Sequence, residues 1–536
     1  MFQTDSSNSI FQLAAELVTN TSRHIFLTGK AGTGKTTFLK YIRGRLNKKT
    51  IVVAPTGVAA INAGGVTMHS FFQLPFGPYV PRSIAPRFGE GGSDTTDKHS
   101  LFKNIRFNTE KRELLQELEL LIIDEVSMVR CDMLDAIDAI LRQFRKNPFV
   151  PFGGVQVLYI GDLFQLPPVV SDTEWDILQE CYKSPFFFNA KIIEEAPPLY
   201  IELKKIYRQN EQHFIDVLNA VRTNTLNAEQ LQVLNDRFDP DFVPVDEKYI
   251  TLTTHNRRAD AINRTELSKL PGTEYVFKGE VKNEFSEKSF PTDIELPLRV
   301  GAQVMFIKND PSPEKRFYNG KLATVTTISD EEIVVMVDGN ELKLEKETWK
   351  NIRYTYEGGD AGIQEEELGS FTQFPIRHAW AITIHKSQGL TFERAIIDAG
   401  ASFAAGQVYV ALSRCTSLEG LVLYSFINRS AISTDNRVLE FARKEVAALE
   451  LEKVLEKEKL RYLFAQLNKA FDWQRITVSI SEFTSNVPMK HLVVPAKTRE
   501  LIGMILPKAK AQQLVAEKFR LQIEQLFDQF METRET

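Results

Sequence analysis

The sequence lacks the features of a membrane or secreted protein. It has no run of eighteen apolar residues, whereas a helix that spans a bilayer needs about 20 of them. Its three cysteines, Cys131, Cys181 and Cys415, are far apart and odd in number, which fits neither a disulfide framework nor a metal-binding motif. The first twenty residues contain no Lys or Arg, so we expect no secretory or mitochondrial leader. These absences predict an intracellular protein in a reducing compartment, and we expect the bacterial cytoplasm.

An excess of positive charge is also missing. The chain has 65 Lys and Arg against 70 Asp and Glu, a net charge of −5. A polyanionic partner would therefore have to bind in a local basic groove, because the protein as a whole does not attract it. With 536 residues, 43% of them hydrophobic, the chain exceeds what one core can hold, and roughly three to four domains are expected.

One glycine-rich stretch organises the chain. An apolar strand is expected over residues 24–28, a helix over 38–42, and a loop with the spacing Gly-x-x-x-x-Gly-Lys-Thr lies between them. Glycines let the backbone wrap a phosphate, the first helix amides point at it, the lysine adds charge and the threonine hydroxyl can bind Mg²⁺. The sequence therefore predicts a site for ATP and Mg²⁺. Its predicted residues are Gly29, Gly32, Thr33, Gly34, Lys35, Thr36 and Thr37.

Two further apolar strands end in polar side chains. Residues 119–123 run into Asp124 and Glu125, and the strand at 156–160 ends shortly before Gln165. The ends of buried parallel strands meet at one edge of a sheet, beside the expected phosphates. We predict that Asp124 holds the Mg²⁺ shell through water and that Glu125 orients and deprotonates the attacking water. Gln165 is predicted to sense the γ-phosphate.

The second half repeats the alternation of strands and helices without a phosphate loop of its own. Strands are expected at 249–253, 394–398 and 420–424, with helices at 256–267 and 405–412. The predicted fold class is thus α/β, with two RecA-like parallel-sheet P-loop NTPase domains that share one nucleotide. Two arginines at element ends, Arg208 and Arg414, are predicted to reach the shared site as arginine fingers.

Taken in order, the motifs resemble those of the Pif-one (petite integration frequency) family of superfamily-one DNA helicases, which move 5′ to 3′. The resemblance covers about residues 11 to 428, and the stretch from 152 to 168 is the most particular to the family. One departure is Leu163, where the family usually has Phe. The matching stretches are residues 29–36, 54–60, 124–128, 152–156, 161–168, 207–209, 383–391 and 406–414.

The resemblance implies an ATP-dependent DNA helicase that binds single-stranded and forked DNA, in replication, repair, recombination or telomere-type maintenance. We expect it to act as a monomer. Two alternatives stay open. One is a RecD-like motor that works only within a larger nuclease complex, and the other is an ATP-switched module that clamps nucleic acid without processive motion.

The resemblance also implies roles for particular residues. Gln12 is expected to hydrogen-bond the adenine, and the aromatic and proline-rich run at 69–79 is expected to meet the duplex junction. The alternative for Phe71 and Phe72 in that run is ordinary core packing. The residues expected to contact DNA are Thr56, Gly57, Val58 and Ala59 from the first domain, His385, Lys386 and Ser387 from the second, and His69 and Phe72 at the junction.

We predict four regions along the chain. The first RecA-like domain spans 1–200 and contains a wedge insertion at about 70–115, and the second combines 201–300 with 375–432. A small β-barrel at 301–374 is expected from alternating strands separated by Asn-Gly and Asp-Gly turns. The family resemblance places this barrel over the DNA exit path. A helical extension at 433–536 lies outside the resemblance, and we expect a hairpin docked on the motor, with a partner-binding or dimerising appendage as alternatives.

Overall fold

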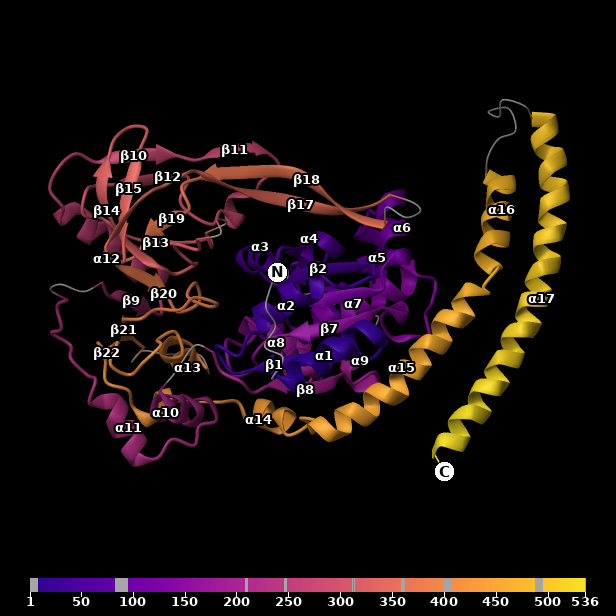
Figure 1. Cartoon of the computed structure of the whole chain (residues 1–536), viewed down its shortest axis with the longest axis horizontal. Helices are drawn as coiled ribbons and strands as arrows, with labels where there is room; N and C mark the ends of the chain where they lie inside the picture. Colours follow the sequence, from indigo (N-terminus) through magenta and orange to yellow (C-terminus); the bar gives the residue numbers. More distant parts are fainter. Residues whose placement is uncertain are drawn as a thin grey trace. The chain divides into compact units, whose positions relative to one another are not determined.

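The computed structural model describes nine stretches of the chain, which form two compact units (Figure 1). The first unit contains Arg23–Ala447 and the residues up to Ala15, and the second contains Glu16–Ser22 and Ala448–Thr536. No helix within the described stretches has both the length and the apolar character needed to cross a bilayer. The described residues are 8–81, 95–207, 211–244, 248–310, 312, 314–357, 362–399, 406–486 and 495–535.

The first unit contains a six-stranded sheet, here called the first parallel sheet, with strand order β3-β2-β6-β7-β1-β8. All its pairings are parallel, and nearly every residue of its central strands is buried. That burial on both faces explains why these strands read as continuous apolar runs. The strands are β1 (Ile25–Gly29), β2 (Thr50–Ala54), β3 (Val66–Thr67), β6 (Leu120–Ile123), β7 (Gln156–Ile160) and β8 (Leu199–Leu203).

Short helices connect these strands, and two-residue strands β4 (Tyr79–Val80) and β5 (Thr96–Asp97) pair outside the sheet. The helices are α1 (Ser9–Asn20), α2 (Lys35–Arg43), α3 (Gly57–Ala63), α4 (Met68–Phe72), α5 (Lys98–Asn104), α6 (Thr109–Glu117), α7 (Cys131–Phe144), α8 (Asp172–Leu178) and α9 (Lys191–Glu195).

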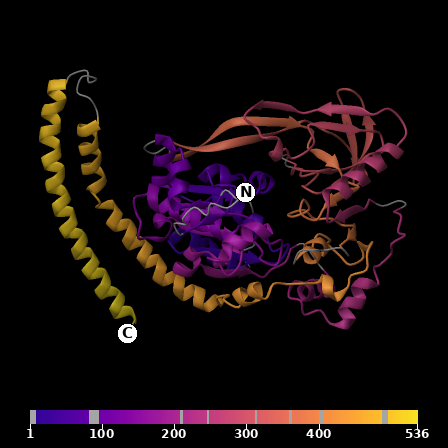
Figure 2. The same ribbon diagram turned by 180° about the vertical axis from the view of Figure 1, so that it is seen from behind.

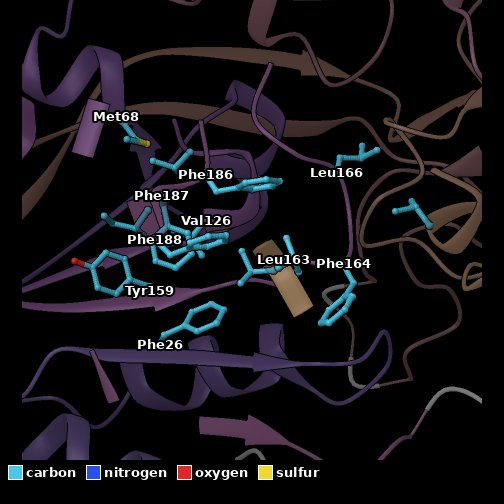
Figure 3. Packing of buried hydrophobic residues seen from close by; sticks show 14 of the residues in the cluster. Phe26, Met68, Val126, Tyr159, Leu163, Phe164, Leu166, Phe186, Phe187 and Phe188 are labelled. Carbon is cyan, nitrogen blue, oxygen red and sulfur yellow. The ribbon is translucent and has the colours of Figure 1, made fainter. Parts of the chain in front are cut away.

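Aromatic side chains fill the core beside this sheet (Figure 3). Leu163, the departure from the family pattern, is buried in the same cluster, so it serves packing at this position. Helix α14 (Asn436–Ala442) contributes Phe441, whose ring stacks on Phe188 at a centroid distance of 4.6 Å. This packing is why the second compact unit starts at Ala448 and not at the predicted residue 433.

The second parallel sheet lies in the same unit and has four strands in the order β20-β9-β21-β22. Three of its strands follow the prediction, whereas β20 is only three residues long and was not foreseen. The strands are β9 (Ile250–Thr253), β20 (Ala381–Thr383), β21 (Ala395–Asp398) and β22 (Leu421–Leu423). The helices of this part are α10 (Gln212–Arg222), α11 (Ala228–Asn235), α12 (Asn256–Lys269) and α13 (Gln407–Leu412).

An antiparallel insertion separates β9 from β20 in sequence. Its five-stranded sheet has the order β16-β15-β14-β13-β19, and β15 alternates buried and half-buried residues as predicted. Its end strands, β16 and β19, do not pair with each other within the described residues, so the sheet is not a closed barrel there. The strands are β13 (Gln303–Phe306), β14 (Leu322–Ile328), β15 (Ile333–Val337), β16 (Asn340–Lys343) and β19 (Ile376–His378), with β10 (Tyr275–Lys278) and β12 (Glu295–Leu298) paired beside them.

A long hairpin of β17 (Glu347–Glu357) and β18 (Gly362–Gln373), with β11 (Glu280–Asn283) at its edge, was not foreseen. It extends from the antiparallel insertion to α6 (Figures 1 and 2). Three contacts attach the hairpin beside the first parallel sheet. Glu365 forms a 3.0 Å ion pair with Arg43, and the ammonium of Lys49 lies 4.9 Å from the ring centroid of Tyr356. The ring of Tyr354 makes an edge contact with Phe71.

The second unit is helical, as expected for the tail. Its helices are α15 (Ala448–Ala470), α16 (Gln474–Asn486) and α17 (Pro495–Glu535). The rings of Phe464 and Phe527 stack at 4.1 Å, which joins α15 to α17. The last residues of α1 belong to this unit, where Glu16 lies 3.6 Å from the ammonium of Lys459.

Candidate nucleotide and nucleic-acid site

A cavity of about 940 Å³, here called the central cavity, opens where the strands of the first parallel sheet end. Its walls come from both parallel sheets, so it brings together residues that the sequence separates by almost 400 positions. The predicted residues in its walls are Gly32, Thr33, Gly34, Lys35, Thr36, Thr37, Asp124, Glu125 and Gln165 from the first side, and His385, Lys386 and Arg414 from the second. Thr56, Val58 and Ala59 also line it.

The loop between β1 and α2 has the conformation that phosphate binding requires. Gly34 has a φ of 88°, a left-handed conformation that favours glycine, and α2 begins at the next residue. The ammonium of Lys35 donates to the carbonyl oxygens of Gly29 at 2.5 Å and of Lys30 at 3.2 Å. The lysine thus folds back over its own loop, where its charge would meet a bound phosphate.

Two carboxylates follow β6 at the wall of the central cavity. Glu125 has a φ of 51°, an unusual conformation for this residue that turns it out of the strand direction. Separation from bulk water raises the pKa of both Asp124 and Glu125, and the charge of Lys35 opposes that shift. Carboxylates with raised pKa values would be stabilised by a cation. Asp124 and the hydroxyl of Thr36 offer the oxygen ligands that Mg²⁺ prefers.

Gln165 connects the two sides of the central cavity. It is largely buried at the loop after β7, and its Oε1 accepts a 3.3 Å hydrogen bond from Nε2 of Gln388. Gln388 follows β20 of the second parallel sheet. The sequence analysis did not single out Gln388, although it lies inside the matching stretch at 383–391. This hydrogen bond joins Gln165 to the turn that holds His385 and Lys386.

Arg414 lies just after α13 and lines the central cavity. Its side chain is 1% exposed, and it donates from Nε to the carbonyl of Val410 at 2.9 Å and from Nη2 to the hydroxyl of Ser413 at 2.9 Å. The positive charge of Arg414 lowers the pKa of Glu125, which places it within electrostatic reach of the predicted base. Arg208, the second predicted finger, lies outside the described residues.

Asn8, Phe11 and Tyr207 line the end of the central cavity beside α1, and the sequence analysis missed all three. Nδ2 of Asn8 donates to the hydroxyl of Tyr207 at 3.4 Å, and its Oδ1 caps α1 by accepting from the amide of Phe11 at 3.2 Å. An Asn just before an amphipathic run was an available signal for this cap. Gln12 lies on α1 but not among the lining residues, so its contact with adenine stays a prediction.

The predicted DNA-gripping turns lie on the other part of the cavity wall. Thr56 caps α3 by accepting from the amide of Ala59 at 3.2 Å, and Gly57 begins that helix. His385 and Lys386 line the cavity, and burial lowers the pKa of His385, which therefore stays neutral near pH 7. Ser387 requires a correction. It is fully buried, and its hydroxyl donates to the carbonyl of Ile384 at 2.7 Å, so its side chain closes its own turn and does not face a ligand.

The aromatic run after α3 divides into a buried and an exposed part. Phe72 is 0% exposed and belongs to the core with Phe71 and Tyr79, so the predicted DNA contact of Phe72 is wrong and the core alternative holds. Phe76, by contrast, is 91% exposed. The ring of His69 stacks on it with a centroid distance of 5.7 Å and an interplanar angle of 11°. An exposed aromatic edge thus exists, at Phe76 and His69.

Comparisons with known protein families agree with this geometry. The family of PIF1-like helicases matches residues 3–232, and the family described as DNA helicase, middle domain, matches residues 454–535. The second match falls on the helical tail, outside the resemblance found from the sequence.

Similar proteins cover most of the chain. The human ATP-dependent DNA helicase PIF1 is 33% identical over 78% of this chain, which spans 60% of that protein's length. The ATP-dependent DNA helicase Pif1 of Campylobacter jejuni is 30% identical, and the alignment covers 78% of this chain and 94% of that one.

Solved structures are similar as well. The Bacteroides Pif1 complex with ADP-AlF4 is 44% identical with a TM-score of 0.74, over 83% of this chain and 97% of that chain. The Bacteroides Pif1 structure bound to ssDNA has the same coverage, 43% identity and a TM-score of 0.57. Both parallel sheets therefore have the RecA-like P-loop helicase fold.

Proposed function

Because the chain belongs to the PIF1-like helicase family of ATP-dependent DNA helicases, we propose that it moves 5′ to 3′ along single-stranded DNA and unwinds forked duplexes. One observation carries this proposal. The central cavity joins the phosphate loop of the first parallel sheet to the turn after β20 of the second. Closing and opening this cavity around ATP changes the spacing of the two gripping turns, so hydrolysis becomes displacement along the strand.

Four side chains in the central cavity have distinct proposed roles in hydrolysis. Lys35 neutralises phosphate charge, and Glu125 takes the proton of the attacking water. Gln165 senses the γ-phosphate, and Arg414 stabilises the charge that develops on the transferring group. The raised pKa of Glu125 suits a base that works near neutral pH. Arg208 remains a proposed second finger, and Gln12 a proposed adenine contact.

Thr36 and Asp124 are the proposed holders of Mg²⁺. Both line the central cavity, and the raised pKa of Asp124 shows a carboxylate that a cation would stabilise. When bound with ATP, Mg²⁺ supplies positive charge to the phosphate oxygens. Asp124 then keeps the ion beside the phosphate loop, directly or through water.

The proposed DNA contacts are with the backbone. Thr56 to Ala59 from one side and His385 with Lys386 from the other would grip the strand, which predicts little sequence specificity. The similar Bacteroides Pif1 has been solved bound to ssDNA, and another similar Pif1 structure concerns unwinding at forked dsDNA. At the duplex junction, we place the exposed Phe76 and the half-buried His69 stacked on it, since a base stacks on an aromatic face for about 1–3 kcal/mol.

We further propose that the chain acts as a monomer in the cytoplasm of a bacterium. Relatives of similar length come from the bacteria Campylobacter jejuni and Bdellovibrio bacteriovorus. Sedimentation of the protein with forked DNA tests the oligomeric state, and a second copy on each fork would contradict the monomer. One similar Pif1 structure does contain two coordinating Pif1 helicases at forked dsDNA.

Two assays test the motor itself. ATP hydrolysis is measured with poly-dT, with poly-rU and without polymer, and unwinding is measured on forks that carry only a 5′ or only a 3′ tail. We expect stimulation by poly-dT and unwinding of the 5′-tailed fork, with Lys35→Ala as the inactive control. Unwinding of the 3′-tailed fork alone would overturn the polarity. Stoichiometric ATP-dependent binding with little turnover would favour an ATP-switched clamp.

A further inference from the structure

A tyrosine of α13 reaches across to the phosphate loop. Tyr409 belongs to the second parallel sheet's side, yet its hydroxyl accepts a hydrogen bond from the backbone N–H of Ala31 at 3.1 Å. The same hydroxyl donates to Oδ2 of Asp162, at the end of β7, at 3.3 Å. One buried side chain thus contacts the phosphate loop and the γ-phosphate-sensing loop of the opposite sheet.

The surroundings of Asp162 fix the direction of this hydroxyl. Asp162 is 0% exposed, and its Oδ1 accepts from Nη2 of Arg222 and from the amide of Phe164, both at 3.2 Å. A carboxylate accepts but does not donate, so the proton of Tyr409 points to Asp162 and its lone pair faces Ala31. Burial, followed by the charge of Asp162, raises the pKa of Tyr409, which therefore keeps this proton.

The start of α13 packs against the loop that follows β7. Gly406 has a φ of 81°, and a Cβ at this position would lie 2.6 Å from the carbonyl oxygens of Phe164 and Gln165. Arg414 follows the other end of α13, and its Nε donates to the carbonyl of Val410 in that helix. The remaining hydrogen bonds of its guanidinium also go to the second side, to the carbonyls of Ser387 and Leu390 and the hydroxyl of Ser413. The position of Arg414 in the wall of the central cavity therefore depends on how α13 sits against the first parallel sheet.

We infer that Tyr409 is a positioning residue for ATP hydrolysis, which holds α13 to the phosphate loop so that Arg414 meets the transferring phosphoryl group. This inference rests on the proposed ATPase function. Tyr409 acts through Arg414 and touches no reacting atom. An arginine finger works only when its geometry is held closely, because small misplacements of a catalytic group cost large factors in rate. The hydrogen bond to Ala31 supplies that constraint directly between the two sides.

The test compares Tyr409→Phe with a matched control, Tyr182→Phe. The hydroxyl of Tyr182 also donates to a buried carboxylate, Oδ2 of Asp135 at 2.8 Å, but it lies outside the central cavity. We expect Tyr409→Phe to lower kcat for DNA-stimulated ATP hydrolysis about tenfold and to change the KM for ATP less than about twofold. Tyr182→Phe should lower Tm but leave kcat unchanged.

A double variant tests the route through Arg414. If Tyr409 only positions this arginine, then Tyr409→Phe combined with Arg414→Ala should be no slower than Arg414→Ala alone. A loss in the double variant equal to the product of the two single losses would overturn the inference. So would an unchanged kcat in Tyr409→Phe.

Hydrogen–deuterium exchange gives a readout that does not depend on turnover. The amide of Ala31 should exchange faster in Tyr409→Phe than in the parent protein and in Tyr182→Phe. Unchanged exchange there would overturn the inference even in an active enzyme. Failure of the parent protein to hydrolyse ATP with any DNA would instead overturn the proposed function, and the exchange at Ala31 would still show whether Tyr409 holds the loop.

Discussion

The two parallel sheets share a fold but differ in what their strand ends carry. The first has six strands and places the phosphate loop, Asp124 and Glu125 in the central cavity. The second has four strands and contributes Arg414 and the turn with His385 and Lys386. On the proposed roles, the first side would bind the nucleotide, whereas the transition state would need a group from both. Such a division makes hydrolysis depend on how the two sheets meet, which is the condition for a motor.

Their insertions differ as well. The first sheet carries short helices and the exposed Phe76 with the half-buried His69 stacked on it, whereas the second carries antiparallel strands and the β17–β18 hairpin. If each sheet has its own task, substitutions on one side should affect binding, turnover and unwinding in a different pattern from substitutions on the other.

The largest effect on ATP hydrolysis is expected from replacing Glu125, the proposed base of the first sheet. Glu125→Gln should lower ATP hydrolysis by several powers of ten and leave nucleotide binding intact, because the amide cannot take the proton of the attacking water. Lys35→Ala should weaken both nucleotide binding and hydrolysis, since Lys35 contacts the phosphates in the ground state. Steady-state hydrolysis and titration with a fluorescent nucleotide measure the two properties. A near-parental rate in Glu125→Gln would refute the assignment of the base.

Substitutions of the proposed arginine finger on the second sheet's side should lower turnover and leave nucleotide binding unchanged. Arg414→Ala is expected to lower DNA-stimulated hydrolysis about a thousandfold or more, and Arg414→Lys should restore little, because an ammonium does not reproduce the planar fork. Arg208→Ala has the same expected direction. The exposed Arg264 of α12 provides a control whose replacement by Ala should be neutral. Full activity in Arg414→Lys would show that Arg414 only forms an ion pair.

Phe72 and Phe76 lie in the same insertion of the first sheet but should have different roles. We expect Phe72 to affect folding stability and Phe76 to affect the unwinding of duplex DNA. Phe72→Ala removes a fully buried ring and should lower the free energy of unfolding by about 3–5 kcal/mol. Phe76→Ala should preserve Tm and DNA-stimulated hydrolysis and reduce unwinding about tenfold. Phe149, which is also 91% exposed, serves as the control for removing a surface ring. Equal losses of hydrolysis and unwinding in Phe76→Ala would contradict a role at the junction.

The smallest expected effect is on pH dependence. Because burial raises the pKa of Glu125, kcat/KM for ATP should begin to fall at a higher pH than it would with an ordinary glutamate as the base, since the base becomes protonated there. Arg414 opposes this shift, so Arg414→Ala should move the acid side of the profile to higher pH. Rates measured from about pH 5.5 to pH 8.5 test this. A move to lower pH would mean that the charge of Arg414 does not act on Glu125.

The parts of the fold that local pattern determines were predictable. The strands β1, β2, β6 and β7 read as apolar runs because both of their faces are buried, and the phosphate loop is specified by adjacent residues. The β17–β18 hairpin was missed because β18 has four consecutive exposed residues and no alternating apolar face there.

The site was less predictable where it depends on tertiary contacts. A run of aromatics does not indicate which ring points outward, so Phe72 and Phe76 were not distinguished. Ser387 lies between predicted contacts, but the tight turn directs its hydroxyl to Ile384. Tyr409 sits in a fully buried helix, and only its partner 378 positions away, Ala31, indicates a task.

The β17–β18 hairpin changes the mechanics of the second sheet. It attaches the antiparallel insertion of the second sheet to the first side beside Arg43 and Phe71, in addition to the contacts of Tyr409 with Ala31 and of Phe441 with Phe188. An exposed ion pair contributes about 0–1 kcal/mol and an aromatic pair about 0.5–1.5 kcal/mol. Breaking contacts of this size costs little free energy, so we expect the hairpin to act as a reversible tether that still lets the second sheet move.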